Sequence, residues 1–537
     1  MNRSILLVVL FLVMLISACG RSPIYEDLPE YYDLQIERSP LRVEASNEMA
    51  YVLNHALMRR VGINQTQNDH MADLMDGRTA FNGNHILRRQ RFYPSTAFLL
   101  IEDAINDIIW LFDELRYFYG AYIFMGGDNA FNRVRDDLIE TMRHWGNPFI
   151  YTHELLYEIG FYLYPVLNDR HAYMIYNDHF YWFGHYYGFL FYHGQFYNNP
   201  SGFNRGVGMP YVTRLSFPFH FGFNNLCIES SFRLSLCNVS GEFVYTIVIP
   251  FYDSWYYHRR LPNFITIHYH DDSIETVPIQ IMHQYYPTMD AMQMARRTAP
   301  SLVDINGIPV VTIPAMWDGF YHASEARRFR QQLNDIASSL YNEPIVIIDI
   351  RNNQGGLLDI PVNFFYNLMR INVPPNFSFV SVGDYHHVTN QLEVVIFGDL
   401  KNHMFGALPM TPSQFGYNQT LLQFVDDGIV YNDTLIILLT NHLTESAGEF
   451  MTDILFNIEN TLVIGTNTGG TFVSTYGRAS VLPRSRIRFY FNCTYLIHPP
   501  NHFSEGLGIA PDIWVRGDAL EAALRMLDRH ITQTTHP

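Results

Sequence analysis

Lysine is almost missing from this chain of 537 residues, which contains a single lysine, Lys401. Nearly all basic residues are therefore arginines. Lys and Arg together number 35 against 52 Asp and Glu, which gives a net charge of −17. A nucleic-acid-binding surface needs clustered positive charge, so this balance argues against nucleic acid as a partner.

Cysteine is also scarce, with four residues in the chain. No CxxC pair or similar zinc spacing occurs, and the GxxxxGK[ST] phosphate loop is absent, so we expect no metal and no cofactor. The alternative is the segment HYH, in which His268 and His270 share one strand face and could bind a metal. Cys227 and Cys237 lie in neighbouring strand-like runs and could form a disulfide in an exported protein.

The N-terminus reads MNRSILLVVLFLVMLISAC. Arg3 precedes a short apolar run, residues 5–18, and the ending ISAC resembles a bacterial lipobox. In that class Cys19 becomes the lipidated first residue of the mature protein; the alternative is an ordinary signal peptide with an incidental Cys19. The lipobox predicts export, contact with a membrane through the N-terminal lipid, and a location in the cell envelope, either periplasmic or surface-facing.

The composition is that of a globular protein, with 48% hydrophobic and 16% charged residues, and the length exceeds one ordinary core. Apolar residues recur first at helical spacing, then in short aromatic and β-branched runs, and finally in buried strands that alternate with amphipathic helices. The predicted fold class is a multidomain α+β protein. The predicted parts are a signal peptide (1–19), a tether (20–45), a helical domain (46–171), a β-rich module (172–295), an α/β core (296–520) and a C-terminal helix or tail (521–537).

A small hydroxyl residue lies where a buried strand meets a helix in TLIILLTNHLTESAGEF, residues 434–450. Ser446 at this place is either a helix cap, completed by Glu449 as a capping box, or a nucleophile. As a nucleophile it would have the N–H of Ala447 beside it as an oxyanion donor at a helix N-terminus. These residues alone favour the cap.

A second strand ends in paired glycines in PIVIIDIRNNQGG, residues 344–356. Gly355 and Gly356 would free the backbone to approach a ligand and direct N–H groups at it, whereas the alternative is a plain loop. Two further motifs follow, GTNTGG at residues 465–470 and EGLGIAPD at residues 505–512.

Together these four motifs, in this order, resemble the S41 peptidase family, which includes the C-terminal processing (tail-specific) proteases and the tricorn core. The resemblance implies a serine-type peptidase with a crotonase/ClpP-like α/β core and a polypeptide substrate. It further implies Ser446 as nucleophile, Gly355, Gly356 and Ala447 as oxyanion donors, and Glu505 in the outer shell of the site. The alternative for Glu505 is a surface carboxylate in a glycine-rich turn.

The family divides by its base. One branch uses a lysine after the serine, which this chain cannot supply because no lysine follows Lys401. The tricorn-like branch uses a histidine after a helical domain, and NDRHA at residues 168–172 occupies that place, so the resemblance implies His171 as base. Arg170 and Ala172 depart from the commoner Gly and Thr. His442 is the local competitor, with no counterpart in the family.

The β-rich module stands where many family members carry a PDZ domain, but no carboxylate-binding loop of that type is recognisable in it. The resulting hypothesis is a membrane-tethered, exported serine peptidase. The alternatives are a serine hydrolase of a non-peptide acyl substrate and a non-catalytic peptide-binding lipoprotein. They are distinguished by whether His171 reaches Ser446. The oligomeric state cannot be predicted from the sequence.

Overall fold

The fold is known from a computed structural model of the chain. It describes residues 43–61, 97–119, 121–122, 125–184, 187–199, 201–206, 208–217, 228–252, 262–282, 298–317, 323–370, 378–381, 392–396, 408–410, 430, 432–456, 458–472, 477–492, 494–496 and 505–533. None of the helices within these ranges is both long and apolar enough to cross a membrane. The predicted signal peptide and Cys19 lie outside the described residues.

A six-stranded sheet forms the centre of the C-terminal part, in the order β14-β15-β16-β20-β21-β25. The strands from β15 to β25 are parallel, and β14 pairs antiparallel at one edge. Every residue of β16, β20 and β21 is buried, as expected for strands covered on both faces. The strands are β14 (Ser301–Ile305), β15 (Ile308–Thr312), β16 (Ile345–Asp349), β20 (Leu435–Thr440), β21 (Thr461–Gly465) and β25 (Ile513–Trp514).

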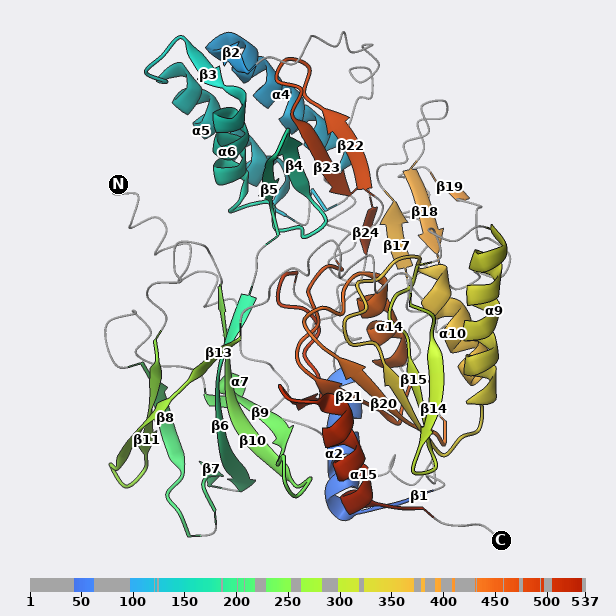
Figure 1. The fold of residues 1–537 in the computed structure, drawn as a ribbon. Coiled ribbons are helices and arrows are strands. Elements are labelled where there is room, and N and C mark those ends of the chain that lie inside the picture. The colour runs from blue at the N-terminus through green and yellow to red at the C-terminus, as the bar shows by residue number, and fades with distance from the viewer. Residues whose placement is uncertain are drawn as a thin grey trace.

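Helices cover both faces of this sheet, which confirms the predicted α/β core (Figure 1). Alternate residues of β16 point to opposite sides, so that Val346 and Ile348 pack with one set of helices and Ile345 and Ile347 with the other. The first set is α9 (Ala323–Ser339), α10 (Asp359–Met369) and α14 (Ala447–Phe456), and the second is α2 (Asn47–Val61) and α15 (Ala519–His530).

The N-terminal end of the described chain differs from the predicted boundaries. β1 (Val43–Ala45), at the end of the predicted tether, pairs antiparallel with β26 (Ile531–Gln533). The following helix, α2, packs on the α/β core beside α15 and not with the other N-terminal helices. An amphipathic helix pattern specifies an apolar face but not the surface that covers it.

A lobe at the top of Figure 1 holds the remaining N-terminal helices. It contains β2 (Phe98–Leu100), α4 (Ile101–Phe118), α5 (Gly127–Arg143), β3 (Phe149–Tyr151) and α6 (Thr152–Leu163). Its sheet has the order β22-β23-β4-β5, so that strands from the C-terminal part complete it. The four strands of this sheet are β4 (Tyr173–Tyr176), β5 (His179–Trp182), β22 (Gly477–Val481) and β23 (Arg488–Asn492), of which the last two come from the C-terminal part. Residues 173–182 therefore belong to this lobe and not to the predicted β-rich module.

The β-rich module consists of two sheets, β13-β6-β10-β9 with β7 paired to β6, and β12-β11-β8. Cys237 carries a free thiol, and Cys227 lies outside the described residues. The elements are β6 (Tyr187–Asn199), β7 (Gly202–Asn204), β8 (Val212–Ser216), α7 (Ile228–Ser231), β9 (Phe232–Leu236), β10 (Phe243–Tyr252), β11 (Phe264–Tyr269), β12 (Ile274–Pro278) and β13 (Gln280–Met282). A further sheet, in the order β19-β18-β17-β24, is formed by β17 (Ser378–Ser381), β18 (Leu392–Ile396), β19 (Leu408–Met410) and β24 (Thr494–Leu496).

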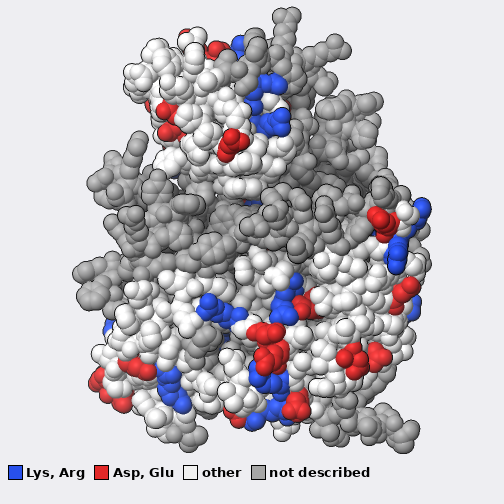
Figure 2. Space-filling view, in the orientation of Figure 1, with Lys and Arg blue, Asp and Glu red and all other residues white. Residues whose placement is uncertain are grey.

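Charge is scattered over the face of the molecule seen in Figure 2. Acidic and basic side chains lie interspersed there, and most of the described surface on this face carries neither sign. The net charge of −17 is therefore not concentrated in one patch on this face.

Candidate active site

Ser446 occupies a sharp turn between strand β20 and helix α14. Its φ of +51° lies in the left-handed region, which is costly for a residue with a side chain and is found where surrounding structure enforces it. Its N–H donates to Glu449 Oε2 at 3.2 Å, which is one half of a capping box. No described residue hydrogen-bonds the Ser446 hydroxyl, which is half-buried at the turn. The hydroxyl is therefore not used as a side-chain cap and is available as a candidate nucleophile.

The paired glycines lie directly against this turn. A Cβ built on Gly355, whose φ is +81°, would stand 2.6 Å from both Ser446 Cβ and Ala447 N. Gly356 has a φ of +141°, and a Cβ there would overlap the carbonyl oxygen of Met316. Only glycine permits both conformations and both approaches.

Two of the three predicted oxyanion donors remain available among the described residues. Asn353 is fully buried, and its Oδ1 accepts the N–H of Gly355 at 2.9 Å, so this donor is already engaged. The N–H of Gly356 has no partner within the described part of the chain. Ala447 is the first residue of α14, where backbone N–H groups lack an intrahelical acceptor. The geometry therefore favours Gly356 and Ala447 as the oxyanion donors.

We expect Gly355→Ala to reduce catalysis by at least ~10²-fold, because the added methyl group would displace the turn that carries Ser446 and Ala447. The matched control is Gly307→Ala. Gly307 has nearly the same φ, +80°, but no atom lies within 4 Å of its Cβ position. Both variants carry the same backbone strain of about 1 kcal/mol, so equal losses of activity would contradict the proposed contact.

His171 lies in the turn between α6 and β4. Its N–H donates to Asp169 Oδ1 at 2.9 Å, and its Nδ1 stands 3.9 Å from the same oxygen, beyond hydrogen-bond range. The side chain is 26% exposed. Burial lowers the pKa of His171 below its usual value, Asp169 opposes the shift, and Arg170 adds to it. The imidazole is therefore neutral near pH 7, as a general base must be.

The turn of His171 and the turn of Ser446 are joined by the residues that precede them. Arg170 Nη2 lies 2.9 Å from Glu445 Oε1, and the two side chains are 1% and 6% exposed. The structure thus brings together two segments that are 275 residues apart. Glu505 supports the same place: its carboxylate accepts the N–H of Arg170 at 3.0 Å and that of Phe472 at 3.1 Å.

Glu449 makes more hydrogen bonds in the site than the predicted capping box requires. Besides Ser446 N–H, its buried carboxylate accepts Thr468 Oγ1–H and the N–H groups of Gly470 and Thr471, all within 2.7 Å. Burial raises the pKa of Glu449 to about 7 although these donors lower it. It therefore fixes the Ser446 turn to the GTNTGG segment. The sequence signal was its position, three residues after Ser446.

His442 also lies within the field of Arg170. Burial, with Arg170 adding to it, lowers the pKa of His442 to about 4. Its imidazole is therefore neutral near pH 7 as well, so protonation state does not distinguish it from His171. The link from Arg170 to Glu445 brings the turn of His171 beside the turn of Ser446 and favours His171 over His442 as the candidate base.

The other two histidines singled out by the sequence make contacts within the β-rich module. His268 Nε2 is hydrogen-bonded to Ser216 Oγ at 2.9 Å, and His270 Nδ1 accepts the N–H of Tyr211 at 3.1 Å. The ring of His270 stacks on Tyr211 with 4.2 Å between centroids. Within the described ranges, no three His, Cys, Asp or Glu residues are grouped so that they could hold a metal ion.

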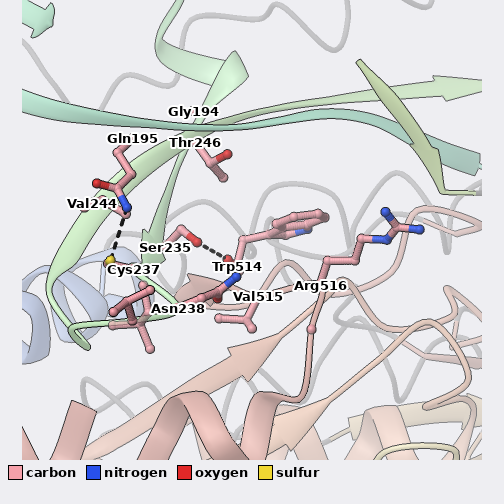
Figure 3. Close-up of a pocket in the computed structure, with 13 residues that line it drawn as sticks. Gly194, Gln195, Ser235, Cys237, Asn238, Val244, Thr246, Trp514, Val515 and Arg516 are labelled. Atoms are coloured by element: carbon pink, nitrogen blue, oxygen red, sulfur yellow. Dashed lines mark hydrogen bonds between the residues drawn. The ribbon is translucent and has the colours of Figure 1, made fainter. Parts of the chain in front are cut away.

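A cavity of about 110 Å³ lies between the β-rich module and strand β25 (Figure 3). Gln195 Nε2 donates to Cys237 Sγ at 3.1 Å on one wall, and Ser235 Oγ donates to the carbonyl oxygen of Trp514 at 2.6 Å on another. Arg516 lines the same space. None of the residues around Ser446 lines it, so this cavity is distinct from the candidate active site.

Residues 307–515 match the model of peptidase family S41. This match confirms the resemblance to the S41 family over this part of the chain, and the protein is a serine-type peptidase whose family acts on polypeptides. A search of curated protein sequences finds no match.

Solved structures similar to this chain include peptidases over most of its length. A protein from Parabacteroides merdae, provisionally named a peptidase, aligns at 13% identity over 80% of this chain and 97% of its own, with a TM-score of 0.41. Mature CPAF aligns at 12% identity over 80% and 95%, with a TM-score of 0.37. The photosystem II D1 C-terminal processing protease aligns at 12% identity over 79% and 96%, with a TM-score of 0.33.

Proposed function

We propose that the protein is an exported, lipid-anchored peptidase that hydrolyses peptide bonds through Ser446 as nucleophile and His171 as base. The observation that carries the proposal is the turn at Ser446, with its φ of +51°, packed against Gly355 and tied to the turn of His171. A non-catalytic binder has no chemical need for a nucleophile, a neutral base and free oxyanion donors together.

The reaction follows from these groups. Ser446 Oγ attacks the carbonyl carbon of the peptide bond while His171 takes its proton. The carbonyl oxygen becomes an oxyanion that accepts the N–H groups of Gly356 and Ala447. Collapse of this intermediate breaks the C–N bond, and His171 returns the proton to the leaving amine. Water, deprotonated by His171, then attacks the acyl-enzyme; the ester C–Oγ bond breaks, and His171 returns the proton to Ser446 Oγ.

The proposed location rests on the lipobox-like sequence before Cys19. Lipidation of Cys19 would hold the peptidase at a membrane outside the cytoplasm, where it would act on exported or surface polypeptides. If so, Cys19→Ser should release the protein from washed membranes. Equal retention of this variant and the wild type would contradict the anchor.

We expect a fluorophosphonate probe to label the purified full-length protein on Ser446, and Ser446→Ala to abolish the label. The matched control is Ser338→Ala on α9, which removes a hydroxyl that bonds Asn367 Oδ1 at 3.3 Å, away from the site. Mass spectrometry of the digested adduct identifies the modified residue. A folded wild-type protein that remains unlabelled, or a label on another serine, would contradict the proposed function.

A further inference from the structure

The segments that carry the proposed nucleophile and base are joined by a buried ion pair. Arg170 Nη2 and Glu445 Oε1 are 2.9 Å apart, and Arg170 Nη1 also donates to the carbonyl oxygen of Gly469. One guanidinium group thus contacts the Ser446 turn and the GTNTGG segment at once. A planar guanidinium with several donors suits this bridging geometry, whereas an ammonium group does not.

The packing around the pair leaves room for both side chains. A Cβ on Gly184 would overlap Arg170, and a Cβ on Gly469 would overlap Glu445. Both side chains therefore run through spaces that only glycine leaves open. Arg170, which is a departure from the family pattern in the sequence, is in this way accommodated by Gly184, and Glu445 by Gly469.

The two backbones of the pair are also fixed. The N–H of Arg170 donates to Glu505 Oε1 at 3.0 Å, and the N–H of Glu445 donates to the carbonyl oxygen of Asn353 at 2.9 Å. Asn353 in turn holds Gly355. The ion pair consequently joins the turn of His171, the turn of Ser446 and the glycine loop into one connected network.

We infer that Arg170 and Glu445 are positioning residues, which hold His171 at the distance and orientation from Ser446 that proton transfer requires. The inference rests on the proposed function, because it concerns the same serine and histidine. Each of the two residues directly precedes the residue that it positions, so a shift of the pair moves the reacting atoms themselves.

The pair has an electrical effect as well as a geometric one. The charged groups around His171 are Asp169, which favours the imidazolium, and Arg170, which disfavours it. Glu445 and Glu505 bond to Arg170, and His442 lies within its field. Removing the positive charge of Arg170 should therefore raise the pH below which His171 is protonated and inactive.

Single substitutions at a buried ion pair leave an unpaired charge and can unfold a protein, so the test uses a double variant, Arg170→Met with Glu445→Gln, which removes both charges. Arg170→Lys is a second variant that keeps the charge but loses the bridging geometry. The matched control is Arg205→Met with Glu275→Gln, which removes an ion pair of 2.8 Å within the β-rich module.

The measurement is the rate of fluorophosphonate labelling from pH 5 to 9, with thermal unfolding recorded beside it. We expect the double variant and Arg170→Lys to remain folded but to label ~10²-fold more slowly, the loss typical of a small misplacement of catalytic groups. As the pH is lowered, labelling of the double variant should also decline at a higher pH than labelling of the wild type does. The control should label as wild type does.

Two outcomes separate the inference from the proposed function. If the folded double variant labels at the wild-type rate with the wild-type pH profile, the pair is merely structural and the inference is overturned. Should the double variant not fold, the same result with Arg170→Lys overturns the inference. If the wild-type protein itself fails to label Ser446, the proposed function fails, and the inference with it.

Discussion

Replacing His171 by alanine is expected to lower the rate of fluorophosphonate labelling and of polypeptide hydrolysis by about 10³- to 10⁴-fold, the range for loss of a catalytic base. The serine would retain its place but would lose the group that we propose takes its proton. The decisive control is His442→Ala, which should remain within a few-fold of wild type. Loss with His442→Ala and retention with His171→Ala would show that the base was assigned to the wrong histidine.

The pH dependence of the wild-type enzyme provides a second readout of the same residue. Burial lowers the pKa of His171 from its usual 6.5, and the reaction requires the neutral imidazole. The rate should therefore stay high as the pH falls to 6.5 and decline only at lower pH. An acid limb above pH 6.5 would contradict a buried neutral histidine as base.

Glu449→Ala should be the most destabilising single substitution in the site, with a loss of at least ~3 kcal/mol in the free energy of unfolding. Four donors lose their acceptor, and each buried donor left unpaired costs about 1–3 kcal/mol. This is a large share of the roughly 5–15 kcal/mol typical of a folded protein. The measurement is unfolding in denaturant, monitored together with labelling of Ser446.

Two further variants define what Glu449 contributes. Glu449→Gln keeps one acceptor oxygen but turns its NH2 group toward two of the four donors, so its stability should lie between those of wild type and Glu449→Ala. Glu140→Ala, at a side chain that is 59% exposed on α5, should change stability by less than ~0.5 kcal/mol. If Glu449→Ala is as mild as Glu140→Ala, the hydrogen-bond network around Ser446 is not a source of stability.

The sequence was informative wherever a function depends on neighbours in the chain. Buried strands ending in Ser446 and in Gly355 and Gly356 were visible as short motifs. Parallel strands place such ends at one edge of a sheet, so β16 and β20, which pair directly, bring them together. The conformation that makes Ser446 a candidate nucleophile, its positive φ, has no local sequence signal because serine rarely adopts it.

Features that depend on distant partners could not be predicted. Arg170 stood out only as an irregularity, since nothing in its neighbourhood names Glu445 as its partner. Strands β4 and β5 read as the start of the β-rich module because their periodicity is that of any short strand, while β23, which pairs with β4, comes much later in the chain. The hydrogen bond from the N–H of Gly355 likewise depends on where the side chain of Asn353 lies and not on the glycine motif itself.

The pairing of β4 with β23 also has a consequence for the order in which the protein matures during synthesis. The turn that carries His171 follows the N-terminal helices, yet its support comes from Glu505, 335 residues after Arg170. A ribosome releases the chain from its N-terminus onward. The lobe that contains β4 therefore remains incomplete until β23, near the C-terminus, has emerged. Contacts of such long sequence separation form slowly. The turn of His171 therefore gains its full support only late in folding, after nearly the whole chain is available.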